Sequence, residues 1–69
     1  MKVVIDLKKF KKARIVKGLS VAQVAEKAGV SYPTVFYTEC GKSTPREATL
    51  IRICEAIGCD PSDIVEIVE

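Results

Sequence analysis

The feature that most constrains the fold is a pair of short helical segments with only about three residues between them. The first segment begins at Ser20, where the residues form a capping-box pattern, and ends at Gly29. The second covers residues 31 to 40, with Ser31 as the predicted N-cap and Gly41 as the terminating residue. So short a connection does not let two helices lie antiparallel along their length. The sequence therefore predicts two consecutive helices that cross at a steep angle.

Apolar stripes predict further helices on both sides of this pair. A first helix, ended by Gly18, is indicated by a stripe at helical spacing that consists of Leu7, Phe10, Ala13, Arg14 and Lys17. A fourth helix, ended by Gly58, is indicated by Leu50, Ile53, Cys54 and Ile57. Asp60 followed by Pro61 is typical of the start of a short fifth helix.

The two ends of the chain differ from the rest. The segments "KVVI" and "VEIV" are short, rich in β-branched residues and bounded by charge, so either is a candidate strand. An antiparallel pairing of the two would hold both ends of the chain and cover two strand edges. Pairing within one chain and pairing across two chains are both compatible with this pattern.

Length and composition predict one small soluble domain spanning residues 1–69. Hydrophobic residues make up 48% of the chain and charged residues 29%, which is typical of a globular protein. The beginning, "MKVVIDLKKF", lacks the apolar core and cleavage site of a signal peptide, and no apolar run is long enough to cross a membrane. We therefore expect a cytoplasmic protein without a membrane partner.

Three cysteines and no histidine limit the chemistry that the chain can perform. An odd number of cysteines argues against a disulfide framework, and their spacing does not suit zinc. No nucleophile has a plausible base nearby, and no glycine-rich phosphate loop is present. The sequence predicts no enzyme activity, no metal and no cofactor.

Basic residues are concentrated near the start of the chain. Residues 1 to 20 contain seven lysines or arginines against one acid, Asp6, whereas residues 21 to 69 contain four against eight acids. Such a cluster attracts a polyanion if it shares a face with a recognition surface. The alternative is an ordinary solvated helix face.

Two short helices joined by a glycine-containing turn form a helix-turn-helix, and the segment "GLSVAQVAEKAGVSYPTVFYTECGKSTP" resembles the core of the lambda-repressor and Cro family of DNA-binding proteins. Ala25 is the small residue where the two helices touch, Gly29 is the turn, and Val35 is the buried β-branched residue. The segment "TLIRICEAIGCDPSDIVEIV" resembles the fourth and fifth helices of the same family, which extends the resemblance to about residues 5 to 66. It implies an all-α, five-helix DNA-binding domain with its motif at about residues 20 to 40.

The resemblance also implies which residues contact DNA. They are Ser31, Tyr32, Pro33, Thr34 and Tyr37 at the second motif helix, and Lys42 and Ser43 in the loop after it. Relatives usually carry Arg, Gln, Asn or Ser at the base-contacting positions, and commonly a glutamine where Val21 stands. We therefore hypothesise that the aromatic rings and the Thr34 methyl group pack on thymine methyl groups. Phe36 is expected to be partly buried against a neighbouring element.

A structural ion pair is implied as well. In the family, an arginine at the position of Arg14 pairs with a glutamate at the position of Glu39, which would fix the angle of the second motif helix. The function implied is a sequence-specific regulator of transcription, a repressor that binds double-stranded DNA as a homodimer. The alternative is a protein-interaction module, because the same fold occurs in antitoxins and an aromatic helix face suits a protein groove.

Overall fold

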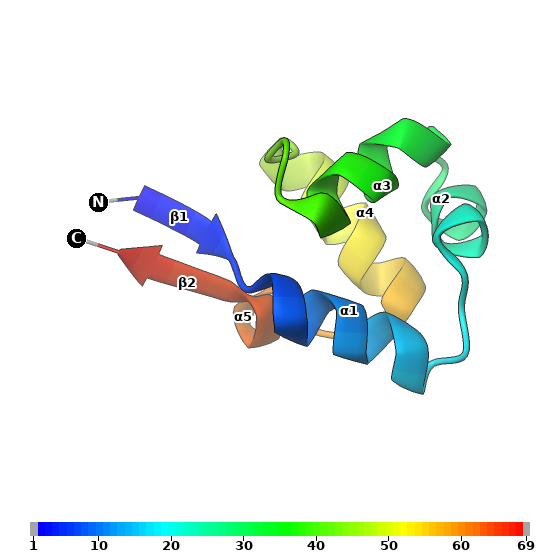
Figure 1. The fold of residues 1–69 in the computed structure, drawn as a ribbon, viewed down its shortest axis with the longest axis horizontal. Coiled ribbons are helices and arrows are strands. Elements are labelled where there is room, and N and C mark those ends of the chain that lie inside the picture. The colour runs from blue at the N-terminus through cyan, green and yellow to red at the C-terminus, as the bar shows by residue number, and fades with distance from the viewer. Residues whose placement is uncertain (1, 69) are drawn as a thin grey trace.

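The structure is a computed structural model that describes residues 2–68. This part of the chain contains five helices and two short strands. In chain order they are β1 (Lys2–Ile5), α1 (Leu7–Val16), α2 (Val21–Ala28), α3 (Tyr32–Cys40), α4 (Glu47–Ile57), α5 (Pro61–Ile64) and β2 (Val65–Val68). Figure 1 shows the two strands side by side at one end of the molecule and the α2–α3 turn at the other. The predicted five-helix architecture is confirmed.

The two ends of the chain pair with each other as antiparallel strands. β1 and β2 run alongside, with Ile5 opposite Val65 at the end nearest the helices. The amide of Asp6 donates to the carbonyl of Ile64 at 2.7 Å, so the pairing continues to the point where both strands meet a helix. Of the two alternatives left open by the sequence, the structure shows pairing within one chain.

Local capping interactions explain where the motif helices begin and end. The Ser20 hydroxyl accepts from the Gln23 amide at 3.1 Å, while the Gln23 side chain accepts from the Ser20 amide at 2.8 Å. This is the predicted capping box of α2. The helix ends at Gly29, whose φ of +71° is a left-handed conformation that costs glycine little. In Figure 1, α2 is seen almost end-on and α3 runs across the view, so the two helices cross steeply.

The core lies between α2, α4 and the ends of the other helices. All four members of the predicted α4 stripe are buried, together with Phe10, Val24, Val35 and Ile64. The predicted α1 stripe is buried only at Phe10, while Leu7 is 37% exposed and Lys17 is exposed. The reason is that α1 lies at the edge of the helical layer and packs through one side against α3 and α5. None of the helices between residues 2 and 68 is both long and apolar enough to span a membrane.

Candidate nucleic-acid interface

Helix α3 has one buried side and one exposed side. Val35 and Thr38, three residues apart, are almost completely buried against the core. The Thr38 hydroxyl donates to the carbonyl of Thr34 at 2.7 Å, which satisfies this buried polar group within the helix. Because one side of α3 is fixed in this way, the residues on its opposite side face solvent.

Most of the residues expected to contact DNA lie on or next to the exposed side. Tyr32 is 50% exposed and Tyr37 is 44% exposed, and Pro33 is exposed between them. Thr34 is half-buried. The structure therefore brings both tyrosines and the proline onto one accessible surface, with Thr34 at its margin.

The predicted cap at Ser31 is wrong in one respect. Ser31 has the extended conformation of an N-cap, but its hydroxyl accepts no hydrogen bond from an amide of the first turn. It lies 2.7 Å from the hydroxyl oxygen of Thr34 instead. The reason is chemical: Pro33 has no N–H to donate, and the amide of Thr34 donates to the Ser31 carbonyl at 3.1 Å. Both hydroxyls remain at the surface beside the start of α3.

Phe36 belongs to this surface, which sequence reasoning missed. It is 38% exposed, and its ring stacks on that of Tyr32 with centroids 5.9 Å apart and an interplanar angle of 14°. It also contacts Tyr37 edge to face at 5.7 Å. Phe36 is partly buried, as expected, and the aromatic rings that it contacts belong to its own helix. The signal was present in the sequence: residues four apart are neighbours on a helix, as Tyr32 and Phe36 are.

Lys42 and Ser43 lie at the other end of α3. Both are exposed in the loop that follows Gly41, and the amide of Lys42 donates to the Tyr37 carbonyl at 2.9 Å. Lys42 lies just beyond the end of α3, a helix whose one charged residue is Glu39. At a rise of 1.5 Å per residue, the nine residues of α3 separate the two ends by about 13 Å. The loop residues and Ser31 thus flank the aromatic surface from opposite ends.

An ion pair holds the last turn of α3 against α1. Arg14 Nε lies 2.8 Å from Glu39 Oε1, and the two side chains are only 14% and 13% exposed. Arg14 Nη1 also donates to the carbonyl of Leu19 at 2.7 Å, in the connection that leads to α2. One side chain thereby links α1, the start of the motif and α3.

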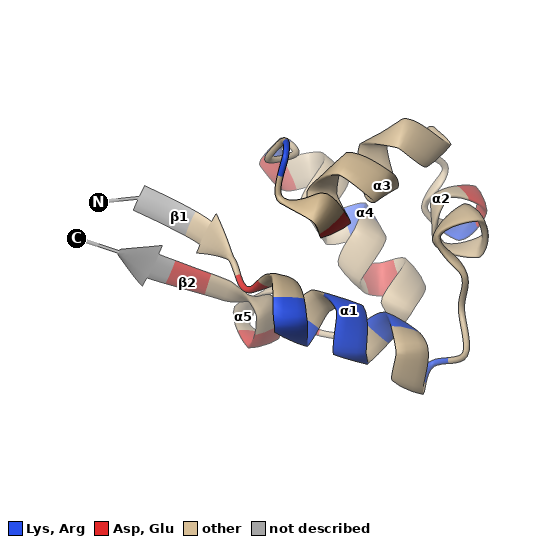
Figure 2. Ribbon diagram, in the orientation of Figure 1, with Lys and Arg blue, Asp and Glu red and all other residues tan. Residues whose placement is uncertain are grey.

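Five of the eleven lysines and arginines lie on α1, and none lies on α3. Figure 2 shows lysines following one another on α1, and those at the exposed positions are Lys8, Lys9, Lys11 and Lys12. The exposed side of α3 contains no lysine or arginine. The aromatic surface is therefore uncharged, with Lys42 as the basic residue immediately after its helix.

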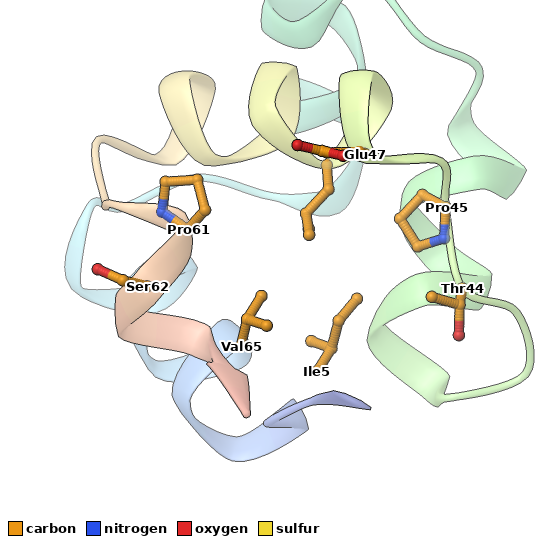
Figure 3. A pocket seen from close by; sticks show the side chains of 8 residues that line it. Ile5, Thr44, Pro45, Glu47, Pro61, Ser62 and Val65 are labelled. Carbon is orange, nitrogen blue, oxygen red and sulfur yellow. The ribbon is translucent and has the colours of Figure 1, made fainter. Parts of the chain in front are cut away.

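A cavity in the described part of the chain is lined by none of the aromatic residues of α3. It has a volume of about 550 Å³ and opens between the sheet, the start of α4 and α5 (Figure 3). Its lining is formed by Ile5, Thr44, Pro45, Glu47, Leu50, Pro61, Ser62 and Val65. One carboxylate among mostly apolar groups does not make a catalytic pair.

The cysteines do not form a reactive or metal-binding centre. Burial, together with the neighbouring thiol of Cys59, raises the pKa of Cys54 to about 12. This thiol therefore stays protonated and unreactive at neutral pH. Among residues 2–68, no three histidine, cysteine or acidic side chains come close enough to hold a metal ion.

A steep pair of short helices with the second one exposed is the geometry of a helix-turn-helix, and a sequence model of the helix-turn-helix family matches residues 10–64. The chain belongs to the helix-turn-helix family. The resemblance to lambda-repressor and Cro proteins is thereby confirmed. This membership supports a role as a DNA-binding regulator of transcription.

A solved structure supports the fold independently. The restriction-modification controller protein C.AhdI from Aeromonas hydrophila is similar with a TM-score of 0.77 and 21% sequence identity. The similarity covers 83% of this helix-turn-helix chain and 86% of C.AhdI. At this identity the similarity concerns the fold. No curated protein matches the chain significantly.

Proposed function

We propose that the protein is a sequence-specific regulator of transcription that inserts α3 in the major groove of double-stranded DNA. The observation that supports this most strongly is the exposed side of α3. In a helix-turn-helix the second helix contacts base edges, and here Tyr32 and Tyr37 on that helix are about half exposed. Large aromatic residues held outside the core of so small a domain serve recognition more readily than stability.

The dimensions of α3 suit such a position. Its length of about 13 Å is close to the major-groove width of about 12 Å. Ser31 and Thr34 present hydroxyls at one end, and Lys42 and Ser43 lie at the other. These groups are suited to phosphates on the two sides of the groove, where they would fix the orientation of the helix without selecting a sequence.

The regulator acts in the cytoplasm as a homodimer on a two-fold related operator. Two copies of α3 would enter successive major grooves, about one helical turn apart. A protein bound at such an operator blocks RNA polymerase, so repression requires only DNA binding. Sedimentation equilibrium over a range of protein concentrations tests the dimer. If only one protein chain binds a DNA duplex that contains two half-sites, the dimer is contradicted.

Fluorescence anisotropy on mixed and AT-rich duplexes at several salt concentrations tests DNA binding. We expect the logarithm of affinity to fall linearly with the logarithm of salt concentration, with a slope near 0.9 per phosphate contacted. Lys42→Ala should reduce that slope by about one unit. Arg52→Ala is the matched control, because it removes an exposed cation on α4 and should leave the slope unchanged. Absence of binding at low salt would refute the proposal.

The aromatic surface also favours a second function, binding to another protein, which the same salt titration tests. Tyr32, Phe36 and Tyr37 are exposed side by side, and α3 has no arginine, asparagine or glutamine to form paired hydrogen bonds with a base. Such a surface also suits a groove on another protein, as in an antitoxin that binds its toxin. Binding to a protein through this surface would not show the salt dependence expected for DNA.

A further inference from the structure

The rings of Tyr32, Phe36 and Tyr37, which we call the aromatic cluster, hold one another in place on the exposed side of α3. Tyr32 lies nearly parallel to Phe36, with centroids 5.9 Å apart, and Tyr37 contacts the same ring edge to face at 5.7 Å. Phe36 is thus the central member. Because each ring restricts the rotation of the next, the cluster presents a preformed apolar surface rather than three independent side chains.

The aromatic cluster is partly exposed to solvent. Its members are 50%, 38% and 44% exposed, in chain order. Within residues 2–68, neither tyrosine hydroxyl forms a hydrogen bond with another part of the chain. Contact between rings of one helix adds nothing to the packing between helices. The surface is therefore available to a ligand that offers apolar groups.

We propose that the aromatic cluster recognises the C5-methyl group of pyrimidines in the major groove, with Phe36 as the residue that determines this specificity. The inference rests on the proposed function, since it concerns the same helix bound to DNA. The thymine methyl group is the apolar feature that a base edge presents in the major groove, and phenylalanine contacts it favourably. The methyl group of 5-methylcytosine occupies the equivalent position on its ring.

Phe36 is singled out by its chemistry and its place. The hydroxyls of Tyr32 and Tyr37 can bond to phosphates or to polar base atoms, so these residues contribute to binding with or without a methyl group. Phe36 has no polar atom in its side chain. Its contribution to selectivity should therefore vanish when the methyl group is absent, whatever the rest of the sequence.

The test compares duplexes that differ by single methyl groups. A duplex enriched from a random pool by the wild-type protein is prepared again with uracil in place of thymine, which removes only the C5-methyl groups. For wild type we expect affinity to fall about fourfold per contacted methyl group, the value for burying one such group. A second pair of duplexes, with cytosine or 5-methylcytosine at the contacted thymine positions, again differs only in the C5-methyl group, and the methylated duplex should bind about fourfold more tightly per contacted methyl group.

Variants then distinguish recognition from structural support. Phe36→Ala should bind the thymine and uracil duplexes equally, with little loss on uracil DNA. Phe36→Leu, which keeps an apolar side chain, should retain part of the selectivity. Ile51→Ala is the control, because Ile51 has a similar exposure, 39%, but belongs to α4 rather than to α3; it should behave like wild type.

The outcomes separate failure of the inference from failure of the proposed function. If wild type binds thymine and uracil duplexes equally, or if Phe36→Ala weakens both by the same factor, methyl recognition is overturned while DNA binding stands. If wild type enriches no duplex at low salt, the proposed function fails and the inference fails with it. Selectivity that is lost only in Phe36→Ala, and not in Ile51→Ala, supports the inference.

Discussion

Replacing Glu39 by alanine should destabilise the protein by about 2 kcal/mol, because it leaves Arg14 without its charged partner. Removing one partner of a fully buried ion pair costs about 3–5 kcal/mol, and a hydrogen bond to a charged group contributes about 1.5–3 kcal/mol. A value of about 2 kcal/mol, below the cost for a fully buried pair, applies here because the two side chains are still 14% and 13% exposed to solvent. Arg14 also retains its hydrogen bond of 2.7 Å to the Leu19 carbonyl.

The assay is urea unfolding followed by far-ultraviolet circular dichroism, together with a thermal melt. For a domain of this size, a loss of about 2 kcal/mol lowers the melting temperature by about 8–16 °C. Glu55→Ala removes an exposed glutamate from the last turns of α4 and should change stability by less than about 0.5 kcal/mol. A double-mutant cycle with Arg14→Ala should give a coupling of at least about 1 kcal/mol. An unchanged melting temperature for Glu39→Ala, or a coupling near zero, would refute the reasoning.

Three further predictions concern other parts of the chain. Tyr37→Ala should lower discrimination between an enriched duplex and random DNA more than it lowers affinity for random DNA, as measured by competition; equal losses would argue against base recognition by this residue. Hydrogen bonds from the amide and then the hydroxyl of Ser62 lower the pKa of Asp60, so its stabilising effect is present above the ordinary carboxylate pKa and is lost as the pH falls through the lowered value. Urea titrations of Asp60→Ala should accordingly show a deficit at neutral pH that closes in acid, and a constant deficit would oppose this. Burial raises the pKa of Cys54 to about 12, so a thiol reagent should modify exposed Cys40 in the native protein and reach Cys54 only on unfolding; equally fast labelling of both would contradict the burial.

The local rules of helix formation were sufficient to predict most of the fold. The Ser20 capping box, the turn at Gly29 and the buried stripe of α4 each depend on residues close in sequence, and the structure contains all three. The Ser31 cap failed because Pro33 has no amide to donate and the Thr34 amide donates to the Ser31 carbonyl instead. The exposure of Leu7 also could not be predicted, since it depends on how much of α1 the other helices cover.

The candidate site was harder to predict for the same reason. Tyr32, Pro33 and Tyr37 were identified from the family resemblance, and α3 does expose them. Phe36 was expected to be partly buried against a neighbouring element and was left out of the residues predicted to contact DNA. Its position depends on two ring contacts within α3. A helical projection that counts aromatic neighbours four residues apart would have placed it with Tyr32.

The central claim is that α3 is the surface that meets DNA, and a nuclear magnetic resonance titration of the isotopically labelled protein with duplex DNA tests it most directly. We predict that the largest changes in amide chemical shift fall on residues 31 to 43. Changes centred on α1, or on the cavity around Leu50 and Pro61, with the amides of α3 unaffected, would contradict the account.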